Sequence, residues 1–84
     1  MKKWELNHNG NKVVVENRVS GKRLYVNDEL QDEQNGFSSN SRLYGQLPTG
    51  EKIKISLGGW FIMQCRIFID NKLVLSNKNI KEQR

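Results

Sequence analysis

Thiol–imidazole or zinc chemistry in this chain would have to rely on one histidine, His8, and one cysteine, Cys65. A thiolate and an imidazole act together only when they touch and a third group orients the ring. Cys65 alternates with polar residues between Met63 and Ile67, which predicts a buried thiol that behaves as a small apolar group. Structural zinc needs four ligands, mostly Cys or His. We therefore expect no catalytic residues, no metal site and no cofactor, and we predict that the protein is not an enzyme.

Four carboxylates close together offer oxygens of the kind that Ca²⁺ or Mg²⁺ accepts: Asp28, Glu29, Asp32 and Glu33. A calcium loop spaces its ligands at alternating positions around a glycine and ends in a distant Glu, and this stretch does not. Paired carboxylates can also share acid and base roles, but only in a cleft that separates their pKa values. An exposed acidic turn is the expected structure.

The segment Ser20-Gly21-Lys22-Arg23 contains part of a phosphate-binding loop, in which backbone amides and a lysine hold a phosphate. The complete motif also has an earlier glycine, a hydroxyl residue after the lysine and a following helix. Here Arg23 stands at the hydroxyl position, and the next residues favour a strand. We expect a turn between two strands rather than a nucleotide site.

Basic and aromatic residues alternate with apolar ones in the second half of the chain. If residues 42–69 form adjacent antiparallel strands, this alternation gathers the basic and aromatic side chains on one outward face. Such a face can follow phosphates and stack bases, although outward positions are polar in any sheet and lysine also protects sheet edges. The candidate interaction face comprises Arg42, Tyr44, Lys52, Lys54, Trp60, Ile62, Gln64, Arg66 and Phe68.

The expected strand at residues 60–69 is apolar on both sides, with Trp60, Ile62 and Phe68 opposite Phe61. A strand with two apolar faces is usually covered on both. In so small a protein a second copy could supply the cover, giving a homodimer. We predict a small non-enzymatic interaction module that binds a protein partner or itself, with single-stranded nucleic acid as the alternative partner.

Short alternating stretches separated by turn residues make up the chain as far as residue 75. Asn9-Gly10 indicates a hairpin, because both central residues of a type I′ turn need positive φ. The clearest alternation places Ile53, Ile55 and Leu57 on one side. The pattern predicts an all-β fold, an antiparallel β-sandwich of two sheets with seven or eight short strands. The expected core is Trp4, Leu6, Val13, Val15, Leu24, Val26, Leu43, Ile53, Ile55, Leu57, Phe61, Met63, Ile67, Ile69 and Leu73.

The 84 residues fit one domain, which we assign to residues 1–75, followed by a polar, basic C-terminal tail at 76–84. The longest apolar run, 58–65, is much shorter than the roughly 20 residues of a membrane-spanning helix. The residues after Lys3 lack the apolar stretch of a signal peptide, and a single cysteine cannot form an internal disulfide. We expect a cytoplasmic protein with no membrane partner, whose net charge of +5 attracts anions.

Two parts of the sequence resemble the domain of the Fas apoptosis inhibitory molecule family. In that family a strand with a Trp leads through a hairpin to an S-G-K-R turn and a strand ending in V-D/N-G. Residues 4–27 are similar to this pattern, with Trp4, Ser20-Gly21-Lys22-Arg23 and Val26-Asn27, and residues 51–74 are similar to the closing hairpins. The resemblance implies an antiparallel β-sandwich and a regulatory, interaction-type protein without known enzyme chemistry. It assigns no functional residues, because the matching positions are expected to be turns and core.

Overall fold

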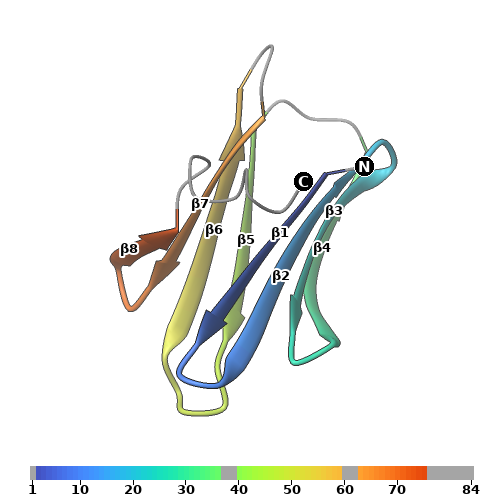
Figure 1. The fold of residues 1–84 in the computed structure, drawn as a ribbon. Coiled ribbons are helices and arrows are strands. Elements are labelled where there is room, and N and C mark those ends of the chain that lie inside the picture. Colours follow the sequence, from blue (N-terminus) through green and yellow to red (C-terminus); the bar gives the residue numbers. More distant parts are fainter. Residues whose placement is uncertain (1, 37–39, 60–62, 76–84) are drawn as a thin grey trace.

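In the part of the chain that is described, eight antiparallel strands form two four-stranded sheets that pack face to face in the computed structural model (Figure 1). The structure describes residues 2–36, 40–59 and 63–75. This arrangement confirms the predicted all-β sandwich and its number of strands. The first sheet contains β1 (Lys2–His8), β2 (Asn11–Arg18), β3 (Gly21–Val26) and β4 (Glu29–Asn35), and the second contains β5 (Asn40–Gln46), β6 (Lys52–Gly58), β7 (Gln64–Ile69) and β8 (Lys72–Leu75), each in chain order.

Two-residue turns with positive φ at both positions join three of the hairpins. The expected Asn9-Gly10 turn has φ values of 51° and 84°, and Asp70-Asn71 has 49° and 67°. Asn27-Asp28 behaves in the same way, with 50° and 71°. Asn, Asp and Gly accept this conformation at low cost, and it matches the twist of adjoining strands. These turns fix the register of the pairs that they join.

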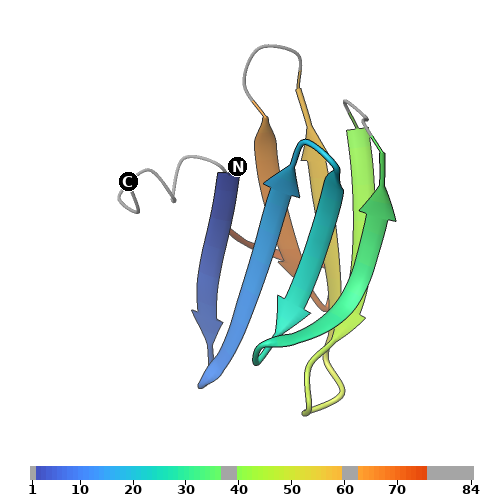
Figure 2. The same cartoon turned by 90° about the vertical axis from the view of Figure 1, so that its right-hand side faces the viewer.

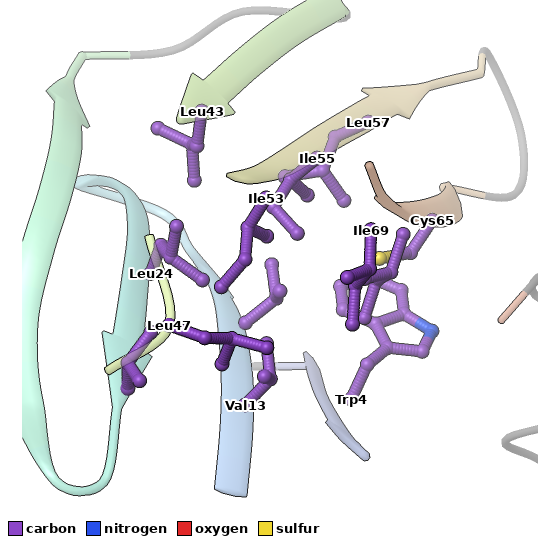
Figure 3. Packing of buried hydrophobic residues seen from close by; sticks show 13 residues of the cluster. Trp4, Val13, Leu24, Leu43, Leu47, Ile53, Ile55, Leu57, Cys65 and Ile69 are labelled. Atoms are coloured by element: carbon purple, nitrogen blue, oxygen red, sulfur yellow. The ribbon is translucent and has the colours of Figure 1, made fainter. Parts of the chain in front are cut away.

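The core lies between the two sheets and consists of the inward side chains of alternate strand positions (Figure 3). Trp4, Val15 and Leu24 from the first sheet are fully buried, as are Leu43, Ile55 and Ile67 from the second. Because successive strand residues point to opposite faces, the two-residue pattern suffices to select nearly all of them. The buried cluster is Trp4, Val13, Val15, Leu24, Val26, Leu43, Leu47, Ile53, Ile55, Leu57, Cys65, Ile67 and Ile69, with Leu6, Met63 and Val74 packed against it.

The expected core is wrong at Leu73, whose residue surface is 54% exposed. The turn at Asp70-Asn71 pairs Ile69 with Lys72 and therefore sets Leu73 opposite the outward Phe68. A bulge follows, and Val74 packs against the core instead. Conversely, Leu47 and Val14 are buried although neither was expected in the core.

Two further boundaries differ from expectation, and some predictions lie outside the described residues. The strand expected at residues 60–69 is β7, which begins at Gln64, and half-buried Met63 precedes it. β4 is a seven-residue strand from Glu29 to Asn35, so Asp32 and Glu33 lie in a strand and not in the expected acidic turn. Phe61, Trp60, Ile62 and the tail at 76–84 fall outside the part of the chain that is described.

The two sheets are joined along one edge by side chains of β4 that bind the backbone of β5, which lies beside it (Figure 2). A register shift between Leu24 and Tyr25 leaves Gln31 as an extra residue in β4. Its side-chain oxygen accepts from the Gln46 amide at 2.7 Å, and its nitrogen donates to the Gln46 carbonyl at 3.0 Å. A bulge turns a side chain in a new direction, and here it satisfies the exposed edge of β5.

Gly45 makes this close approach of the two sheets possible. A Cβ atom at Gly45 would lie 2.6 Å from the Gln31 side-chain oxygen and 2.9 Å from a Leu24 methyl carbon. Both distances are shorter than ordinary van der Waals contact. The glycine in the middle of β5 is therefore required by packing between the sheets, not by its own backbone conformation.

No helix in the ranges that the structure describes is long and apolar enough to cross a lipid bilayer.

Candidate functional site

The register of the second sheet brings most of the candidate interaction face together. β5, β6 and β7 pair so that Tyr44 lies opposite Lys54, and Lys54 lies opposite Phe68. The adjacent row on the same face, two residues further along each strand, is Arg42, Ser56 and Arg66. Gln64 on β7 and Lys52 on β6 extend the same surface, whereas Trp60 and Ile62 lie outside the described residues. We call this outward side of β5–β8 the basic face.

Cations dominate the basic face because the strands that form it contain no carboxylate. β5 to β8 contain neither Asp nor Glu, and four of their five basic residues lie on this face: Arg42, Lys52, Lys54 and Arg66. The fifth, Lys72, pairs with the inward Ile69. Within the described chain, none of these five forms an ion pair. Like charges on neighbouring strands repel one another, so an anion bound to this face would relieve that repulsion.

The first sheet balances its charges internally. Lys12 contacts Asp28 at 2.9 Å, and Arg18 contacts Glu16 at 2.9 Å. Arg23 contacts Glu33 at 3.2 Å. Strands β1 to β4 contain the carboxylates Glu5, Glu16, Glu29, Asp32 and Glu33. The positive charge available to a partner is therefore concentrated on the second sheet.

A row of apolar and aromatic side chains crosses the middle of the basic face. Tyr44 is 56% exposed, and Leu73 on β8 is 54% exposed. Between them, the Lys54 ammonium lies 4.9 Å from the centre of the half-buried Phe68 ring. This distance is typical of a cation–π contact, which holds the lysine over one face of the ring. Leu73 was missed as a surface residue, although its position follows from the two-residue turn and the outward Phe68.

A shallow depression of about 520 Å³ lies on the basic face where β5 meets β6. Arg42, Tyr44, Ser56 and Asn40 line it, together with Ser41 and Leu57. Ser56 and the following outward position, Gly58, are small, whereas the opposite positions on β5 and β7 have longer side chains. The surface is therefore hollowed between β5 and β6, with Arg42 among the residues that line the hollow.

The histidine and cysteine do not form a nucleophilic pair in the described structure. Cys65 is fully buried, and burial raises the pKa of its thiol to about 12. At neutral pH such a group is a protonated thiol and a poor nucleophile. His8 lies at the end of β1, where its ring nitrogen is 3.5 Å from a Glu51 carboxylate oxygen. No hydrogen bond joins His8 to Cys65 among the described residues.

The acidic segment forms separate contacts rather than a shared cation site. Asp28 binds Lys12, and Glu33 binds Arg23. Asp32 accepts from the backbone amides of Tyr44 and Glu33, both at 2.8 Å. Over the described ranges, no three residues of the types His, Cys, Asp and Glu are grouped so that they could hold a metal ion.

The phosphate-loop fragment has a structural explanation. The turn comprises Val19 and Ser20, and β3 begins at Gly21. A Cβ atom at Gly21 would collide with the carbonyl oxygen of Gln34, because β3 and β4 run very close there. Lys22 is only 2% exposed and occupies an inward position like Leu24. Its ammonium is therefore not presented to a phosphate in solvent.

Comparisons of the chain with protein-family models, with curated proteins and with solved structures found no match.

Proposed function

We propose that this protein is a non-enzymatic interaction module that binds a partner protein through its basic face. The observation that carries the proposal is the composition of the basic face, which holds four basic residues and no carboxylate around the exposed Tyr44 and Leu73 side chains. Protein interfaces combine aromatic and apolar contacts with charges that match the partner. The resemblance to the Fas apoptosis inhibitory molecule family supports the same class of function. A reducing compartment such as the cytoplasm suits a chain with a single cysteine.

The charges favour a different partner over a second copy of the basic face. In a face-to-face dimer, the basic residues of one copy would meet those of the other, because the strands of this face contain no carboxylate. Like charges placed together in an interface cost several kcal/mol. Self-association, which the apolar character of residues 60–69 suggested, would therefore have to use another surface. An acidic partner is the occupant that this surface fits.

Photo-crosslinking tests the proposal. Tyr44 is replaced by photoreactive benzoyl-phenylalanine in cells of the source organism, and Tyr25 is replaced in the same way as the matched control. Tyr25 lies between Val14 and Leu30 on the outward side of the first sheet. We expect a crosslinked protein from position 44 and not from position 25. Crosslinking at both positions alike, or at neither, would contradict the proposal.

The identified partner is then purified and titrated against the wild type and Lys54→Glu. Charge reversal at the centre of the basic face should weaken binding at least tenfold. Lys3→Glu, which reverses a charge on the exposed outer face of the first sheet, should have little effect. Equal losses in both variants would point to a general charge effect and not to the basic face.

Single-stranded nucleic acid is the second candidate, favoured by an exposed tyrosine beside Arg42. Sequence-independent binders combine a cationic groove with several aromatic platforms, each of which stacks a base. Here Lys54 lies over the Phe68 ring, and Leu73 cannot stack. Fluorescence anisotropy with an oligo(dT) strand at low salt tests this candidate. Tight, salt-sensitive binding that is lost in Lys52→Glu/Lys54→Glu would favour it over a protein partner.

A further inference from the structure

The outward positions of β6 become smaller along the strand, from Lys54 to Ser56 and then Gly58. β6 is flanked by β5 and β7, and Ser56 is one of the residues that line the depression on the basic face. Register places Ser56 directly between Arg42 and Arg66. A serine position thus lies between two arginine positions on the neighbouring strands.

The spacing of this row suits a single small anion. Adjacent strands are about 4.8 Å apart, so the Arg42 and Arg66 backbones lie about 10 Å apart across Ser56. Both arginines are exposed, and neither forms an ion pair with another described residue. A guanidinium presents a planar fork of donors that matches a carboxylate, and a serine hydroxyl adds a further donor. Two forks and a hydroxyl can therefore surround one carboxylate above Ser56.

We propose that Arg42, Ser56 and Arg66 form a binding site for a side-chain carboxylate of an acidic segment in the partner protein. The inference rests on the proposed function and adds the chemistry of what is bound. A carboxylate is favoured over a nucleic-acid phosphate because a nucleic acid would also need several aromatic rings on which its bases can stack. Lys54 occupies one face of the Phe68 ring, so Tyr44 is the stacking surface that is left. The neighbouring row of Tyr44 and Leu73 then contacts apolar side chains of the same segment.

The test is an NMR titration of the full chain with defined probes. The probes are an eight-residue peptide of alternating Glu and Ser, the same peptide with Gln in place of Glu, and oligo(dT) of equal length. The signals followed are the backbone amide of Ser56 and the side-chain Nε–H groups of Arg42 and Arg66. We expect the Glu peptide to shift these signals and the Gln peptide to leave them unchanged.

Four variants separate a specific site from a general positive field. Arg42→Gln and Arg66→Gln should each weaken binding of the Glu peptide about tenfold, as expected for loss of a charge-assisted hydrogen bond. Arg42→Lys should weaken it nearly as much, because an ammonium cannot bind a carboxylate through a two-pronged fork. Lys3→Gln removes a charge from the first sheet and should leave the affinity unchanged. Amide signal dispersion confirms that each variant is folded.

Three results would overturn the inference: shifts centred on Lys52 and Lys54 with none at Ser56, full affinity in Arg42→Lys, or stronger binding of oligo(dT) than of the Glu peptide. The proposed function is judged separately by crosslinking of the purified partner from position 44. If Arg42→Gln/Arg66→Gln still crosslinks at the wild-type level, the carboxylate site is wrong and the protein-binding face remains. If the wild type does not crosslink, the proposed function itself fails.

Discussion

A carboxylate oxygen of Asp32 on β4 accepts a hydrogen bond from the backbone amide of Tyr44 on β5 at 2.8 Å. The bond crosses from the acidic edge strand of one sheet to the exposed tyrosine of the other. It satisfies an edge N–H of β5 and fixes the backbone from which Tyr44 projects. The geometry of the basic face therefore depends on a residue in the opposite sheet.

Removal of this carboxylate should destabilise the protein. We expect Asp32→Ala to lower the free energy of unfolding by about 1–2 kcal/mol, because it leaves the Tyr44 and Glu33 amides without their acceptor. Urea denaturation measures the change. Glu29→Ala, at an exposed position of the same strand, should stay within about 0.5 kcal/mol of the wild type. Equal stability of Asp32→Ala and the wild type would show that water replaces the carboxylate at no cost.

An added methyl group in β5 should force the sheets apart. Gly45→Ala places a Cβ atom against Gln31 and Leu24 at distances that require movement, so we expect a loss of about 1–3 kcal/mol. Gln31→Ala in the same chain removes one of the two clashing side chains. The loss for the double variant should then be smaller than the sum of the two single losses, as a double-mutant cycle would show. Simple additivity would mean that Gln31 does not limit the space at Gly45.

The corrected position of Leu73 predicts unequal effects of two leucine truncations. Leu73→Ala removes an exposed side chain and should change the free energy of unfolding by less than about 0.5 kcal/mol. Leu57→Ala removes a buried one and should cost about 2–5 kcal/mol. Thermal denaturation followed by circular dichroism compares the two. A large loss in Leu73→Ala would show that this leucine is covered in solution.

The buried thiol predicts a loss of stability in alkali. The folded pKa of Cys65 is about 12 and its ordinary value is 9.0, so between these values the unfolded chain ionises its thiol while the folded chain keeps the proton. Stability from this group is complete below pH 9 and falls as pH rises, by at most about 1.4 kcal/mol per pH unit. Urea titrations from pH 8 to pH 11 measure the slope. Cys65→Val should lose stability less steeply over that range, and parallel curves for the two proteins would contradict the assignment.

Reactivity gives a second measure of the same burial. The Cys65 thiol should react with Ellman's reagent only when the chain opens, so the rate should rise sharply through the urea transition. Fast labelling of the native protein would place the thiol within reach of solvent.

Local patterns were enough to predict the fold class. The alternation through Ile53, Ile55 and Leu57 identifies β6, and its inward side is buried as expected. Asn9-Gly10 and Asp70-Asn71 adopt the positive φ values that their residue types favour. These signals involve residues close in sequence, and so they can be recognised without the tertiary structure.

Other features depend on pairings that no local pattern shows. β4 is almost entirely polar, so its extent is not visible from hydrophobic alternation. The hydrogen bonds of Gln31 to β5 require a bulge whose position is set by pairing with β3. The row Arg42, Ser56 and Arg66 likewise needs the registers of two pairs of strands at once. Leu73 was assigned to the core because its side chain is apolar, whereas the two-residue turn at Asp70-Asn71 indicates the outward position that it occupies.

The hydrogen bonds of Gln31 and Asp32 to the backbone of β5 also hold the two sheets together along one side. The two sheets approach closely along β4 and β5, whereas β1 and β8 are the outer strands on the other side. In partial opening, the two sheets should therefore separate first at β1 and β8, while β4 and β5 stay together. In hydrogen exchange, amides of β1 and β8 should lose protection first, and the Tyr44 amide should be among the last on the basic face.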